Sequence, residues 1–105
     1  MDYRVVWTRG AIANLTDIAE YVKRDSPYYA SVVVFKIRTA ARSLKKYPYR
    51  AHRMRELDDN QLREIVIYDY RLIYEIFEGE QPRIEILMIV HSARMLQSDE
   101  FLRNN

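Results

Sequence analysis

The chain has 105 residues, of which 49% are hydrophobic and 30% charged, and it carries a formal net charge of +2. This size predicts a single domain over residues 1–105, built around one hydrophobic core. The absence of cysteine excludes disulfides and thiolate chemistry, and the two histidines lack metal-ligand spacing, so we expect neither a metal nor a cofactor. No stretch is long and apolar enough to span a membrane and no signal peptide is evident, so we expect a cytoplasmic protein without membrane contact.

The first half of the chain predicts a strand followed by two helices. Residues 3–8 (YRVVWT) are β-branched and aromatic, as in a short strand. Thr8 then suits the N-cap of an amphipathic helix over residues 9–24, and Ser26 with Pro27 predicts the start of a second helix. The apolar stripe of the first helix comprises Ile12, Leu15, Ile18 or Ala19, and Val22. The stripe of the second helix comprises Ala30, Val33, Ile37, Ala40 and Leu44.

The second half predicts an antiparallel sheet. The first of its four expected strands is polar enough for a sheet edge and the last is the most apolar: residues 52–57, 62–67, 70–77 and 83–90. Residues 98–104, with Ser98 as the cap, predict a short C-terminal helix. The expected fold class is α+β, with an N-terminal strand and a two-helix hairpin packed on one face of an antiparallel sheet, in the order β-α-α-β-β-β-β.

The loops between the strands fix a register. A two-residue loop pairs Ile67 with Tyr70, and a longer loop pairs Phe77 with Arg83. Side chains alternate between the two faces of a sheet. An uninterrupted ladder therefore gives the helices an apolar face made of Ile65, Ile67, Leu72, Tyr74, Ile76, Ile84, Ile86, Met88 and Val90.

The opposite face is expected to hold two candidate sites. Arg71 and His91 would lie on adjacent strands and form an anion site with Arg94, and Glu56 is the nearest carboxylate that could act as a base. An apolar patch on the same face is predicted to bind a partner and comprises Val66, Ile73, Leu87 and Ile89.

Each polar candidate also has a purely structural interpretation. Arg71 could pair with Glu64 or Asp69. His91 could cap the end of its strand, Arg94 could bind acids in the C-terminal segment, and the glutamate could be an ordinary exposed acid. Catalysis and structure are therefore both open at this point.

Positive charge is concentrated between residues 36 and 55, where no Asp or Glu occurs. The basic residues of this span are Lys36, Arg38, Arg42, Lys45, Lys46, Arg50, Arg53 and Arg55. Such a local field can steer an anionic partner, either nucleic acid or an acidic protein. A solvated helix face beside a basic edge strand explains it equally well.

Three motifs, in this order behind a strand and two helices, resemble the RelE/ParE toxin superfamily of bacterial toxin–antitoxin modules. They are REL (55–57), YRLIYE (70–75) and IVHSARML (89–96), and the resemblance covers nearly the whole chain. It implies a small cytoplasmic toxin neutralised by a cognate antitoxin that wraps around it. RelE-type members cut mRNA on the ribosome with a cluster of basic residues and often a C-terminal tyrosine. ParE-type members share the fold but are reported as inhibitors of DNA gyrase.

The departures from the RelE-type pattern favour the ParE-like branch. Arg71 matches the arginine of the family's YRL strand, and Arg94 matches the arginine after the last strand. The strand over residues 62–67 reads LREIVI, with Glu64 and Val66 where RelE-type toxins carry lysines. The tyrosine expected a turn after Arg94 is missing.

The leading hypothesis is therefore a ParE-like toxin of a plasmid-stabilisation type, with its antitoxin and DNA gyrase as partners. The alternative is a ribosome-dependent mRNA endoribonuclease, in which Arg71 and Arg94 would stabilise phosphate charge and His91 or Glu56 would transfer protons. A third hypothesis is a basic interaction domain without toxicity.

Overall fold

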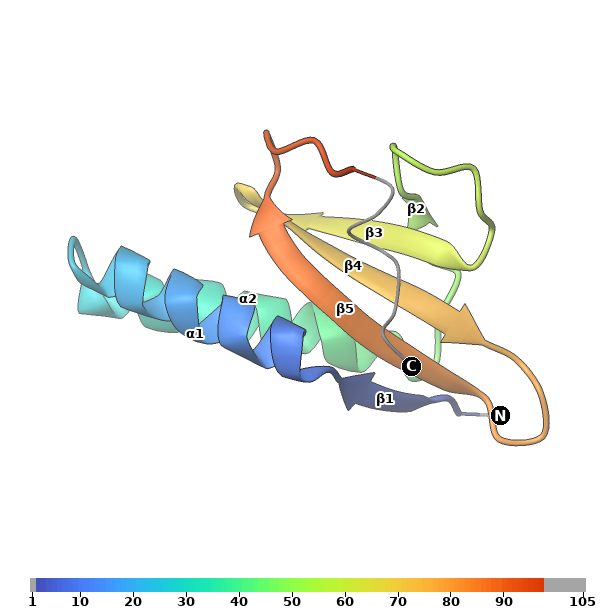
Figure 1. Ribbon diagram of the computed structural model, residues 1–105. Helices are drawn as coiled ribbons and strands as arrows, with labels where there is room; N and C mark the ends of the chain where they lie inside the picture. Colours follow the sequence, from blue (N-terminus) through green and yellow to red (C-terminus); the bar gives the residue numbers. More distant parts are fainter. Residues whose placement is uncertain (1, 98–105) are drawn as a thin grey trace.

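The computed structural model describes residues 2–97 and shows two helices packed on one face of a five-stranded sheet (Figure 1). The elements, in chain order, are β1 (Arg4–Trp7), α1 (Arg9–Lys23), α2 (Pro27–Ser43), β2 (His52–Arg53), β3 (Leu62–Ile67), β4 (Tyr70–Phe77) and β5 (Arg83–His91). The predicted α+β class and order of elements are confirmed. The short helix expected over residues 98–104 lies outside the described residues.

The sheet has the strand order β1-β5-β4-β3-β2. Four of its strands form antiparallel pairs, but β1 lies parallel to β5, with Val5 opposite Ile84 and Trp7 opposite Ile86. The sheet is therefore mixed, with a parallel edge strand that the sequence had not indicated. The two helices, which join β1 to β2, lie together on the other side of this sheet from the final segment of the described chain (Figure 1).

Both helices begin at the predicted caps. The Ala11 amide donates to Thr8 Oγ1 at 3.2 Å, and the Tyr29 amide donates to Ser26 Oγ at 3.1 Å. Pro27 occupies the first turn of α2, where no backbone N–H is needed. These local contacts satisfy amides that the helix itself leaves without a partner.

Most of the predicted helix stripes are confirmed as buried: Leu15 and Val22 on α1, and Ala30, Val33, Ile37 and Leu44 at the sheet side of α2. On α1 the buried positions are Ala11, Leu15 and Val22, whereas Ile12 is 53% exposed, so its predicted place in the core is wrong. On α2 Ala41 is buried in place of the predicted Ala40. A small side chain against the sheet lets a helix backbone approach closely. The spacing of apolar residues along a helix does not predict this preference for a small residue at the sheet.

A β-bulge interrupts the ladder between β4 and β5. Near the loop the predicted register is confirmed, since Tyr74 lies opposite Ile86. The register then shifts, and Ile73 lies opposite Met88, which leaves Leu87 as the extra residue. The face assignment of every later β5 residue therefore reverses.

The reversal changes which residues enter the main core. Ile89 is 2% exposed and belongs to the cluster beneath the helices, whereas Val90 points to the opposite face. The predicted positions of Met88 and Val90 beneath the helices are wrong.

A second apolar cluster covers the face opposite the helices. Its buried members are Met54, Leu62, Ile73, Val90 and Leu96, and half-buried Leu57, Leu87 and Met88 pack against them. The predicted edge strand over residues 52–57 is too long, because the chain leaves the sheet after β2 and turns across this face. The sheet is therefore packed on both sides.

A buried isoleucine of α2 and an exposed isoleucine of α1 together test which side of each helix faces the core. Ile37 is fully buried, so Ile37→Ala should lower the free energy of unfolding by about 3 kcal/mol through lost burial and a residual cavity. Ile12→Ala removes an exposed side chain and should cost under about 1 kcal/mol. Urea denaturation of both variants measures the difference, and equal losses would contradict the helix phase.

Candidate functional site

Arg71 lies in β4 on the face opposite the helices and is fully buried. Its Nε donates to Glu64 Oε1 at 3.1 Å, and its Nη1 donates to Glu56 Oε2 at 2.8 Å. Its Nη2 reaches both carboxylates. Each nitrogen of the guanidinium thus donates to a glutamate, and we call these three residues the buried ion cluster.

The buried ion cluster also holds backbone groups from the covering segments. Glu56 accepts from the Leu96 amide at 2.9 Å, and Arg71 Nη1 donates to the Arg94 carbonyl at 3.0 Å. Glu64 accepts from the Arg55 amide at 3.3 Å. The cluster therefore joins β3 and β4 to the turn after β2 and to the chain beyond β5.

One arginine and two glutamates leave the cluster with one excess negative charge, and Arg55 offsets it with its Nη2 3.6 Å from Glu64 Oε2. Hydrogen bonds from Arg71, supported by the Leu96 amide, hold the pKa of Glu56 below its usual value, although burial opposes the shift. Glu56 in turn raises the pKa of Arg71. Both groups therefore stay ionised around neutral pH, and the guanidinium is saturated by carboxylates instead of being open to a phosphate.

His91 does not join this cluster. It lies opposite Tyr70 at the end of β5, with the two ring centroids 6.1 Å apart at an interplanar angle of 75°. The Ala93 amide donates to His91 Nδ1 at 3.1 Å, so the neutral ring carries its proton on Nε2. The predicted sharing of one face by Arg71 and His91 is wrong, because the bulge turns His91 to the helix side. Its alternative role as a cap at the strand end is confirmed.

Glu56 and Arg94 are brought to Arg71 in different ways. Glu56 lies in a turn three residues beyond the end of β2, not at the end of a strand, and its carboxylate is almost fully buried. Arg94 contributes its carbonyl, while the residue itself is exposed. Of the structural alternatives for Arg71, pairing with Glu64 is confirmed.

The predicted apolar patch is not a continuous surface. Ile73 is fully buried in the second apolar cluster and Ile89 is buried beneath the helices. Leu87 is half-buried, and only Val66, at 49%, is substantially exposed. The bulge places Ile89 beneath the helices, whereas Ile73 and Leu87 keep the predicted face but pack in the second apolar cluster, so the predicted open patch is wrong.

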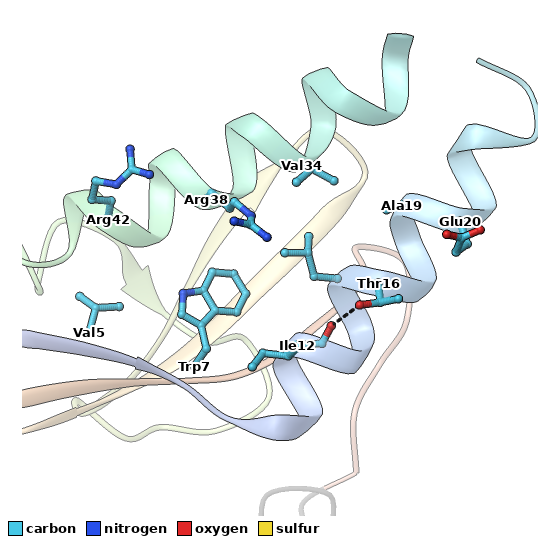
Figure 2. Close-up of a pocket in the computed structure, with 10 residues that line it drawn as sticks. Val5, Trp7, Ile12, Thr16, Ala19, Glu20, Val34, Arg38 and Arg42 are labelled. Atoms are coloured by element: carbon cyan, nitrogen blue, oxygen red, sulfur yellow. Dashed lines mark hydrogen bonds between the residues drawn. The ribbon is translucent and has the colours of Figure 1, made fainter. Parts of the chain in front are cut away.

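A deep groove of about 600 Å³ lies between α1, α2 and β1 (Figure 2). We call it the interhelical groove. Its residues are Val5, Trp7, Ile12, Leu15, Thr16, Ala19, Glu20, Val34, Arg38 and Arg42. Figure 2 shows Trp7 between the two helices, with Arg38 and Arg42 on the α2 side. Neither arginine forms an ion pair with any residue in the range 2–97.

Sequence reasoning missed this groove, although two signals pointed to it. Ile12 fits a stripe beside the buried one, and Arg38 and Arg42 are spaced to share a helix face. Residues 2–97 contain no group of three or more His, Asp or Glu that could hold a metal, and no helix among them could cross a membrane.

Comparisons with known proteins agree with this architecture. The family model described as the ParE toxin of the type II toxin–antitoxin system parDE matches residues 5–96. Toxin RelE2 of Caulobacter vibrioides is 37% identical over 93 residues, which cover 88% of this chain and 98% of that protein.

Two solved structures share the fold at lower identity. The chromosomal ParDE toxin–antitoxin system from P. aeruginosa superposes with a TM-score of 0.66 at 23% identity, covering 85% of this chain and 95% of the other. A mutant of the E. coli toxin RelE in the free state superposes with a TM-score of 0.64 at 16% identity, covering 89% and 86%.

The fold is that of the RelE/ParE toxin superfamily. Within it, the chain belongs to the ParE toxin family of type II toxin–antitoxin systems.

The buried ion cluster predicts a large effect for one substitution. Arg71→Met should lower the free energy of unfolding by about 3 to 5 kcal/mol, because it leaves the buried Glu56 carboxylate without its cation and Glu64 with only the partly exposed Arg55. The matched control Arg83→Met breaks a partly exposed pair with Glu85 and should cost under about 1 kcal/mol. Urea denaturation measures both.

Adding Glu56→Gln and Glu64→Gln to Arg71→Met should restore most of the lost stability, because no unpaired charge remains. A loss in Arg71→Met no larger than that of the control would contradict a buried ion cluster.

Proposed function

We propose that this chain is a toxin that acts by binding its target, that a cognate antitoxin neutralises it, and that its target is DNA gyrase. Its family and its similarity to a solved ParDE toxin–antitoxin system support this proposal. The family supports the class of toxin. The choice between gyrase and mRNA as the target depends on whether catalytic groups are accessible at the surface.

The observation that carries the proposal is the burial of Arg71 between two glutamates. Cleavage of RNA requires cationic groups that reach the phosphate and an acid or base beside them. Arg71 is closed to solvent, Glu56 is committed to it, and His91 lies on the other face of the sheet. A toxin without an accessible catalytic cluster acts through contact surfaces.

The interhelical groove is the surface best suited to the antitoxin. Trp7, Leu15 and Val34 give it an apolar lining, and Arg38 and Arg42 add two cations without carboxylate partners in the described chain. An amphipathic helix with an apolar face and acidic flanks complements such a groove. We therefore place a helix of the antitoxin in it.

A ribosome-dependent mRNA endoribonuclease remains the second candidate, favoured by the 37% identity to a protein named toxin RelE2. In that case Arg94, which is exposed, and His91 would be the accessible groups for phosphate charge and proton transfer. Arg71 and Glu56 would then act only by holding the Arg94 segment in place.

Induction of the toxin alone in bacteria separates the candidates. Inhibition of gyrase should trigger the DNA-damage response and produce long filaments while messages stay intact. A nuclease should stop translation quickly and leave cleaved messages. Co-expression of the antitoxin is the control that should restore growth. Cleaved messages without DNA damage would contradict the gyrase proposal, and harmless expression would favour a non-toxic interaction domain.

The antitoxin site has its own test. Ile12→Lys places a charge in the groove without disturbing the core, and should weaken antitoxin binding at least about tenfold, as the loss of an apolar anchor does. Phe35→Lys is the matched control, because this exposed α2 residue does not line the groove. Calorimetric titration measures both, and equal affinities would exclude the groove.

A further inference from the structure

A smaller pocket of about 280 Å³ lies where α1 passes the end of β5 and the start of β4. We call it the aromatic pocket, and it is lined by Asp17, Ile18, Tyr21, Tyr70 and His91. Antiparallel pairing places the last residue of β5 beside the first residue of β4, which brings two of its rings together. The end of β5 and the adjoining α1 can be followed in Figure 1.

The aromatic pocket is separate from the interhelical groove. Asp17, Ile18 and Tyr21 line the pocket, whereas the interleaved α1 residues Thr16, Ala19 and Glu20 line the groove. At about 100° per residue these two sets lie on different sides of the helix. A partner in the groove therefore leaves the pocket to be filled by something else.

Three rings give the pocket its chemistry. Tyr70 and His91 meet edge to face, and Tyr21 closes the side formed by α1 with 65% of its surface exposed. His91 Nδ1 accepts from the Ala93 amide, which fixes the orientation of its ring. Burial and the charge of Asp69 raise the pKa of Tyr70, so its phenol stays neutral at physiological pH. The two tyrosine rings are aromatic surfaces of the kind that attract cations.

Within residues 2–97, Asp17 is the one acidic residue that lines this pocket. Asp17 is exposed, lies one helical turn before Tyr21 on the same side of α1, and has no hydrogen-bond or ion-pair partner for its carboxylate among the described residues. Asp69 adds a second negative charge beside Tyr70. No lysine or arginine of the described chain lines this pocket.

We propose that the aromatic pocket receives an arginine side chain from a protein partner. A guanidinium is flat and weakly hydrated, so it stacks on aromatic rings while it donates to a carboxylate. The volume suits one side chain and is smaller than that of most small-molecule sites. This inference goes beyond the proposed function, because it defines the chemistry of a contact whichever target the toxin has.

Two small probes test the chemistry on the full chain. N-acetyl-arginine N-methylamide should shift the ring resonances of Tyr70 and His91 in an NMR titration. N-acetyl-citrulline N-methylamide has nearly the same shape without the charge, and should bind at least about fivefold more weakly. Equal binding of the two probes, or shifts confined to other residues, would overturn the proposal.

Substitutions of the pocket's aspartate and of one tyrosine test whether each side chain contributes to binding of the arginine probe. Asp17→Asn and Tyr21→Ala change exposed side chains, and each should weaken binding of the arginine probe by roughly five- to tenfold. Asp25→Asn is the matched control, because this exposed aspartate does not line the pocket, and it should leave the affinity unchanged. Unchanged affinity in Asp17→Asn would overturn the assignment. Tighter binding of spermidine than of the arginine probe would assign the pocket to a free polyamine instead of a protein.

Discussion

Arg71 is enclosed by Glu56 and Glu64 in the layer between the sheet and the segments that cross it. A guanidinium cannot be buried without partners, and here both partners are carboxylates that themselves accept backbone amides. The same contacts hold the Arg94 carbonyl and the Leu96 amide, and Leu96 completes the second apolar cluster. The buried ion cluster thus contacts both segments that cross this face of the sheet.

This constraint also decides which surfaces can act. An arginine at the centre of the sheet, matched by motif to the family, lies inside the protein and stabilises it. Two surface features suit recognition: an apolar groove with two arginines on one side of α1, and an aromatic pocket with an aspartate on another. A toxin that works by binding is consistent with both.

Sequence reasoning was most accurate where local contacts decide the structure. Thr8 and Ser26 cap the helices as expected, and the tight loop fixed the register of β3 against β4. The bulge at Leu87 could not be found in this way, because the residues around it are all apolar and a one-residue shift leaves no trace in their pattern. The one-residue register shift places His91 and Ile89 on the other face of the sheet, so the predicted site does not form. Glu64 was anticipated as a partner of Arg71, but Glu56 reaches it through a turn that no strand pattern indicates.

The most direct test of this account is the NMR signal of the Arg71 Nε–H group in the purified toxin. If the guanidinium is buried between two carboxylates, this proton should exchange slowly with water. Its resonance should also stay in place when inorganic phosphate or a short RNA is added. Exchange at the rate of a solvent-exposed arginine, or a shift that saturates with phosphate or RNA, would contradict the account and return Arg71 to a catalytic role.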